Sequence, residues 1–113
     1  MLGITTAVVS LMLAVSVNAP EVDCLGVYEI TAYSYHEGGG ENYETASGEE
    51  PVPYYTVAAT KDFAFGEKLY IEGIGEVCVQ DRGAFPQGVI DLHIGYDDPV
   101  PWGRQERQVW RVN

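Results

Sequence analysis

Two aspartates lie where a pair of carboxylates could do chemistry. Asp81 and Asp91 are ten positions apart, within residues 80–93. We expect Asp81 to end one strand and open a glycine-containing turn, and Asp91 to lie in the middle of the next strand. Side chains alternate between the two faces of a strand, so Asp91 faces away from the core if its apolar neighbours face inward. Those neighbours are Ile90, Leu92 and Ile94.

A carboxylate on such a face fits the cleavage of a glycosidic bond. Most glycosidases use two carboxylates, one as the acid and one as base or nucleophile. A lytic transglycosylase can use a single group, which protonates the leaving oxygen and then takes a proton from the sugar's own C6 hydroxyl. That acid needs a raised pKa, which a nearby carboxylate or an apolar wall supplies. The alternative of equal weight is that Asp91 is an exposed carboxylate, or one bonded to a neighbouring loop.

The elements that must position these carboxylates are strands. Alternating, β-branched and aromatic segments predict strands at 25–33, 55–59, 68–72, 76–80, 89–94 and 108–112. No segment after residue 20 shows a sustained helical period. The chain is therefore predicted to be all-β, a small closed six-stranded barrel over residues 25–113. Residues 36–53 form an expected long surface loop, which is either functional or a mobile excursion without a role.

Charge and length limit the possible partners. The chain has 113 residues, enough for one domain, and 17 acidic against 6 basic side chains give a net charge of -11. Nucleic-acid binding needs a basic face, and docking on anionic lipid needs the same. We expect a monomer that binds no nucleic acid and contacts no membrane beyond a possible N-terminal anchor.

Residues 1–19 predict a signal peptide or an N-terminal anchor. The run to Val17 is apolar and uncharged, and it ends in a small-residue pattern at Val17-Asn18-Ala19. It is shorter than a spanning helix of about 20 residues, so a buried helix of a cytosolic fold is a further alternative. The export interpretation places the protein in the periplasm, the cell envelope or outside the cell.

The two cysteines, Cys24 and Cys78, permit one disulfide in an exported protein, with two free thiols as the alternative. His36 and His93 form no metal-ligand pattern with these cysteines. The Asp97-Asp98 pair lacks enough ligands for calcium. We expect no metal and no cofactor.

Several short motifs occur in an order that resembles the three-aspartate (3D) domain and the catalytic barrel of the membrane-bound lytic transglycosylase A family. The resemblance covers roughly residues 28–112. Its most specific part is an Asp-x-Gly element followed by Gly-x-x-Asp and Trp-Gly. The motifs include Ile30-Thr-Ala-Tyr33, Gln80-Asp-Arg-Gly83, Gly88-Val-Ile-Asp-Leu92 and Trp102-Gly-Arg104.

The resemblance implies a double-psi β-barrel whose groove binds peptidoglycan glycan strands. It also implies that Asp91 is the catalytic acid and base and that Asp81 supports it. The substrate-binding residues implied or expected beside them are Thr31, Tyr33, Asp62, Gly83, His93 and Trp102.

The chain departs from the family pattern at the first aspartate. That aspartate usually follows a Val-Ala pair, and here Ala59 and Thr60 hold the place while Asp62 is shifted. Two alternatives therefore stay open. One is a non-catalytic glycan-binding barrel of the rare lipoprotein A or barwin-like kind, which the phrase Asp-Arg-Gly-Ala-Phe also suggests. The other is a structural domain of an envelope or phage particle.

Overall fold

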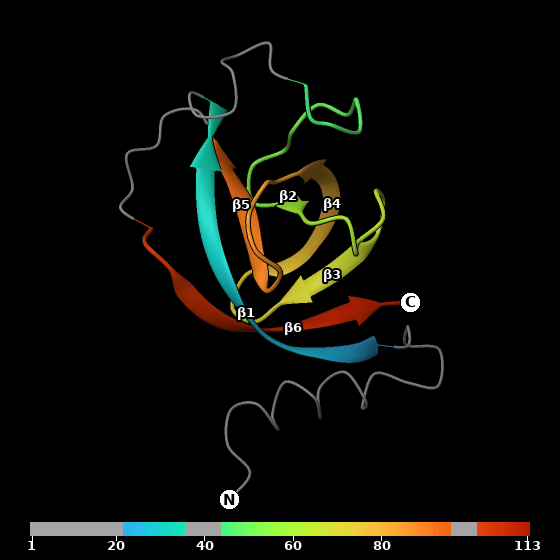
Figure 1. Cartoon of the computed structure of the whole chain (residues 1–113), viewed down its shortest axis with the longest axis vertical. Coiled ribbons are helices and arrows are strands. Elements are labelled where there is room, and N and C mark those ends of the chain that lie inside the picture. Colours follow the sequence, from blue (N-terminus) through green and yellow to red (C-terminus); the bar gives the residue numbers. More distant parts are fainter. Residues whose placement is uncertain (1–21, 36–43, 96–101) are drawn as a thin grey trace, which may run out of the picture.

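A closed barrel of six strands forms the fold (Figure 1). The computed structural model describes residues 22–35, 44–95 and 102–113. Around the barrel the strands follow the order β1-β5-β2-β4-β3-β6. The prediction of an all-β, six-stranded barrel is confirmed, and each expected strand overlaps an observed one. The strands are β1 (Val22–Ser34), β2 (Thr56–Ala59), β3 (Lys68–Ile71), β4 (Gly75–Arg82), β5 (Val89–Gly95) and β6 (Gln105–Val112).

Some sequence predictions fall outside this range. The expected signal peptide at 1–19, His36 and the Asp97-Asp98 pair all lie outside the described residues. Within the described ranges, no helix has the length and apolar character needed to cross a membrane.

The barrel mixes parallel and antiparallel neighbours. β1 pairs with β5 in parallel, and β2 pairs with β4 in parallel, while the other four pairings are antiparallel. The long strand β1 runs along β6 in its first part and along β5 in its last part (Figure 1). Around the barrel wall, β1, β5, β2 and β4 are consecutive strands, and these four carry the candidate site.

The interior follows the alternation expected from the sequence. On β5, Ile90 and Leu92 are fully buried, whereas Asp91 between them is half-buried on the outer face. Burying an aliphatic side chain of this size contributes about 1.5–3 kcal/mol. The fully buried Ile, Leu and Val residues are Ile30, Val57, Leu69, Ile71, Val77, Val79, Ile90, Leu92 and Val109.

A bulge in β4 changes which way Asp81 points. Val77 and Val79 fill the core, so strict alternation would direct Asp81 inward as well. The register with β2 shifts, however: Val57 pairs with Val79, but the next residue, Ala58, pairs with Asp81. The extra residue in β4 reverses the alternation, as bulges do. Asp81 therefore lies beside Ala58 on the outer face.

Candidate functional site

An open pocket of about 470 Å³ lies over the outer faces of these four strands and the turn after β4. Four paired residues cross it in one row, with Thr31 opposite Asp91, Asp91 opposite Ala58, and Ala58 opposite Asp81. Neighbouring strands are about 4.8 Å apart, so the Cα atoms of the two aspartates are about 10 Å apart. Only the Ala58 methyl group separates them in this row. The lining is Thr31, Ala32, Tyr33, Ala58, Asp81, Arg82, Gly83, Ala84, Phe85 and Asp91.

Asp81 is the fixed carboxylate of the pocket, with 4% of its surface exposed. The Tyr33 hydroxyl donates to its Oδ2 at 2.9 Å. Its Oδ1 accepts from the backbone N–H groups of Ala46 and Arg82, both at 2.9 Å. These bonds tie strand β1 and the segment before β2 to the end of β4. Asp81 therefore organises the pocket.

Asp91 is the more accessible of the two carboxylates. It is half-buried in the middle of β5 and lines the pocket directly. The Thr31 hydroxyl donates to its Oδ1 at 2.8 Å. A carboxyl group that is oriented by a hydroxyl and lines a pocket can exchange a proton with a bound molecule.

The wall after β4 is built by an aromatic ring over a glycine. A Cβ atom on Gly83 would lie 1.8 Å from the Phe85 ring, so the missing side chain is what makes room for that ring. Phe85 ends the Asp-Arg-Gly-Ala-Phe motif, and no role was predicted for it. An aromatic residue in a glycine-containing turn between two aspartates is the signal that could have identified it. The sequence around Ala58 gives no sign of its place in the pocket, because that place depends on the pairing of β2 with β4 and β5.

His93 lies behind the pocket. It was expected to bind substrate, but it is fully buried, and neither ring nitrogen has a hydrogen-bond partner within the described residues. Its ring makes edge-on contacts with Tyr33 at 5.1 Å and Tyr35 at 4.5 Å between centroids. Burial lowers the pKa of His93 below its usual 6.5, and the Asp81 carboxylate opposes this in part. The imidazole is therefore neutral at pH 7 and supports Tyr33 from behind.

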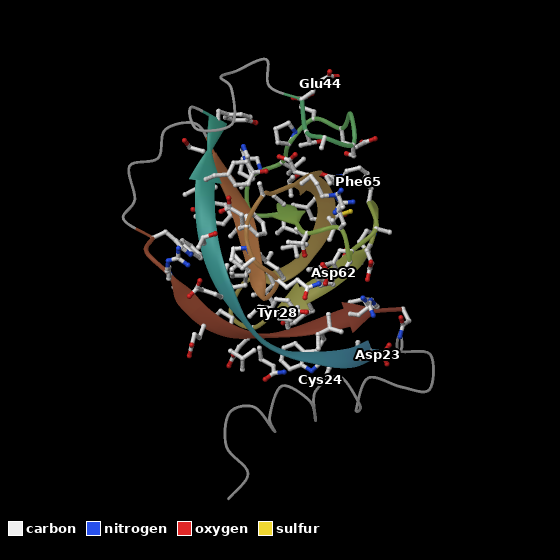
Figure 2. The ribbon with its side chains drawn as sticks, in the orientation of Figure 1. Asp23, Cys24, Tyr28, Glu44, Asp62 and Phe65 are labelled. Atoms are coloured by element: carbon white, nitrogen blue, oxygen red, sulfur yellow. The ribbon has the colours of Figure 1, made fainter. Side chains whose placement is uncertain are left out.

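Trp102 and Asp62, also expected to contact substrate, do not line the pocket. Trp102 packs against the core, and its Nε1 donates to the Ile30 carbonyl at 3.0 Å. Asp62 is exposed and bonds the Thr60 hydroxyl in the turn after β2. Figure 2 shows it beside Tyr28, whose pKa is raised by burial and further by the Asp62 charge. Its shift past the end of β2 directs the carboxylate away from the row of paired residues.

The structure has two free thiols, the alternative to the disulfide that the sequence permits. Cys24 is an exposed free thiol on β1, and Cys78 is a buried free thiol on β4 (Figure 2 labels Cys24). Their strands are three places apart around the barrel in either direction. A disulfide needs Cα atoms within about 7 Å, which opposite walls of a barrel do not allow. Burial raises the pKa of the Cys78 thiol.

The remaining sequence-predicted residues come together. The first pocket is lined by Asp81, Asp91, Thr31, Tyr33 and Gly83. Among the residues that the structure describes, no group of three or more His, Cys, Asp or Glu side chains could hold a metal ion.

A comparison with protein-family models finds none that matches the sequence, and a comparison with curated proteins finds no match either. What the pocket can do therefore follows from its own residues. It offers a fixed acceptor, an accessible carboxyl group and an aromatic wall. Such a lining suits an uncharged molecule that combines hydroxyl groups with apolar faces.

Proposed function

We propose that the protein is a peptidoglycan lytic transglycosylase in which Asp91 is the acid and the base. The observation that carries the proposal is the row across the pocket: an accessible carboxylate oriented by Thr31, and a fixed carboxylate on the same face. The resemblance of the surrounding motifs to the three-aspartate domain supports peptidoglycan as the substrate class.

The proposed reaction has two proton transfers at one group. The Asp91 carboxylic acid gives its proton to the glycosidic oxygen as the bond from C1 breaks. Positive charge develops at C1, as in other glycoside cleavages. The Asp91 carboxylate then takes the proton of the C6 hydroxyl, whose oxygen bonds to C1. The products are a shortened glycan with a free hydroxyl and a 1,6-anhydro sugar, and the acid is restored.

The neighbouring residues act by position and charge. Thr31 holds Asp91 in one orientation through its hydroxyl. Asp81 contributes negative charge on the same face, which favours the positive charge developing at C1. It also fixes Tyr33, whose ring lies against the pocket.

A second function, glycan binding without cleavage, has an observation in its favour. Asp62 lies outside the pocket, which leaves two carboxylates among its described lining residues. Of these, Asp81 already accepts hydrogen bonds from Tyr33, Ala46 and Arg82. A site with one accessible carboxylate could hold a sugar without cutting it.

The deciding experiment is digestion of purified sacculi, with mass spectrometry for 1,6-anhydro muropeptides. Asp91→Asn keeps the shape but cannot transfer a proton, so cleavage should fall by about 10²–10⁴-fold. Asp81→Asn should reduce it less. Asp23→Asn is the matched control, because Asp23 is an exposed carboxylate on β1 outside the pocket.

Two results would redirect the proposal. A folded Asp91→Asn protein that cleaves as fast as wild type removes Asp91 from catalysis. A wild-type protein that sediments with sacculi but releases no product supports the binding function. Circular dichroism of each variant checks the fold.

The proposal brings further predictions with it. Peptidoglycan lies outside the cytoplasmic membrane, so the protein must be exported or released, as the apolar segment at 1–19 suggests. The double-psi form of the barrel and the monomeric state stay predictions. Fractionation of an epitope-tagged protein tests the location, and a wholly cytosolic protein with no release factor would contradict the substrate.

A further inference from the structure

A second pocket of about 310 Å³ lies next to the first, near the end of β4. The two pockets share consecutive residues: Gln80 lines the second pocket and Asp81 lines the first. Arg82, from the wall of the first pocket, has its guanidinium 4.1 Å from the ring centroid of Phe65 in the second. The lining of the second pocket is Ser47, Glu49, Phe65, Gly66 and Gln80.

A closed turn stands between the pockets. The Thr45 backbone and hydroxyl both donate to the Glu49 carbonyl, at 3.2 and 2.7 Å. The same turn reaches both sites, because Ala46 N–H donates to the Asp81 carboxylate while Ser47 N–H donates to the Gln80 carbonyl at 3.1 Å. The turn and the bulged end of β4 therefore fix the two pockets relative to each other.

Phe65 provides the second pocket with an aromatic surface. The side chain is 43% exposed, although large apolar residues are usually covered. Figure 2 shows it at the periphery of the barrel, at the same end as Glu44. The guanidinium against its ring is itself held, since Arg82 Nη1 donates to the carbonyls of Ala59, Thr60 and Phe63 at 2.9–3.2 Å.

The geometry points to a second saccharide subsite, and we propose that one sugar of a glycan strand stacks on Phe65 while its neighbour lies over Asp91. This inference rests on the proposed glycan substrate. An aromatic face binds the apolar C–H face of a sugar. The Ser47 hydroxyl, the Glu49 carboxylate and the Gln80 amide around the ring can bond its hydroxyl groups. Gln80 Oε1 already accepts from Thr56 at 2.7 Å, which orients the amide.

The test is titration of the ¹⁵N-labelled protein with N-acetylglucosamine oligosaccharides of increasing length, followed by NMR. Short oligosaccharides should shift the amides of the first pocket, such as Gly83 and Asp91. Longer ones should also shift Ser47, Gly66 and Gln80. Phe65→Leu should weaken binding of the longer oligosaccharides by about three- to tenfold and leave the short ones unchanged. Tyr54→Leu, an exposed aromatic residue lining neither pocket, is the matched control.

The possible results distinguish a failure of the second subsite from a failure of the proposed glycan function. Shifts confined to the first pocket at every length, or equal affinities of Phe65→Leu and wild type, overturn the second subsite and leave the glycan function standing. If no oligosaccharide shifts either pocket, the second subsite is overturned, and the digestion of sacculi decides separately on the glycan substrate. Shifts in the second pocket without the first would contradict a continuous groove.

Discussion

Replacing Asp81 by alanine should cost the barrel a large part of its stability. The substitution removes the acceptor of hydrogen bonds from the Tyr33 hydroxyl and from the N–H groups of Ala46 and Arg82. Those donors would then face a cavity. The two parts of the chain that meet at Asp81, β1 and the segment before β2, would lose these side-chain bonds to β4, and the Ser47 N–H bond to the Gln80 carbonyl would remain.

The size of the effect follows from these bonds. A hydrogen bond to a charged group contributes about 1.5–3 kcal/mol. Asp81 is almost fully buried, but it borders an open pocket, so water entering the space would bond some of the donors. We therefore expect Asp81→Ala to lower the free energy of unfolding by about 3–5 kcal/mol. Small domains have about 5–15 kcal/mol in total, so the loss is severe.

Asp81→Asn separates the hydrogen bonds from the charge. The amide oxygen can still accept from Ala46 and Arg82, and the amide N–H can donate to the Tyr33 oxygen. Only the charge assistance is lost, about 1 kcal/mol. Urea unfolding followed by tryptophan fluorescence measures both variants. If Asp81→Ala loses under about 1 kcal/mol, or if the two variants are equally destabilised, the carboxylate does not hold the pocket together.

Three further predictions concern stability and reactivity. Burial lowers the pKa of His93, so its contribution to stability is complete above pH 6.5 and is lost as the pH falls through the lower folded-state pKa. In parallel urea titrations, the His93→Phe variant should therefore lose less stability than wild type between about pH 7 and 5, and identical pH profiles would contradict this. Gly73→Ala should cost about 1–2 kcal/mol, because φ is +79° there and a Cβ would meet Arg107 Nη1 at 2.2 Å; an unchanged urea midpoint would refute it. Iodoacetamide should modify exposed Cys24 in the native protein and buried Cys78 only in urea, as intact mass would show, and fast native labelling of both would contradict the burial.

The sequence predicted best where one strand is regular. Alternation on β5 correctly places Ile90, Leu92 and Ile94 inside and Asp91 outside. The same alternation puts His93 on the outer face, but it cannot show what covers that face. Tyr33 on β1 and Tyr35 just after its end contact the imidazole, and Tyr33 reaches it through the parallel pairing of β1 with β5.

Asp81 and the cysteines show what local patterns omit. The bulge that turns Asp81 outward depends on the register between β4 and β2, which no alternation within β4 reveals. The disulfide prediction used an even cysteine count and an expected compartment, and neither contains the distance between two strands. Phe65, the centre of the proposed second subsite, is a single aromatic residue in a turn, and the sequence around it does not show that its ring is exposed.

The parallel pairings also determine when the pocket comes into existence during folding. Its bonds join residues far apart in the chain: Thr31 to Asp91 across 60 positions, and Tyr33 to Asp81 across 48. Contacts of such long range require large loops to close first, which slows folding to about the millisecond-to-second range. No hairpin among the described strands contains the site, since β1, β2, β4 and β5 must all be in register before the row of paired residues forms. Recovery of ligand binding after dilution from denaturant should therefore coincide with barrel closure and never precede it.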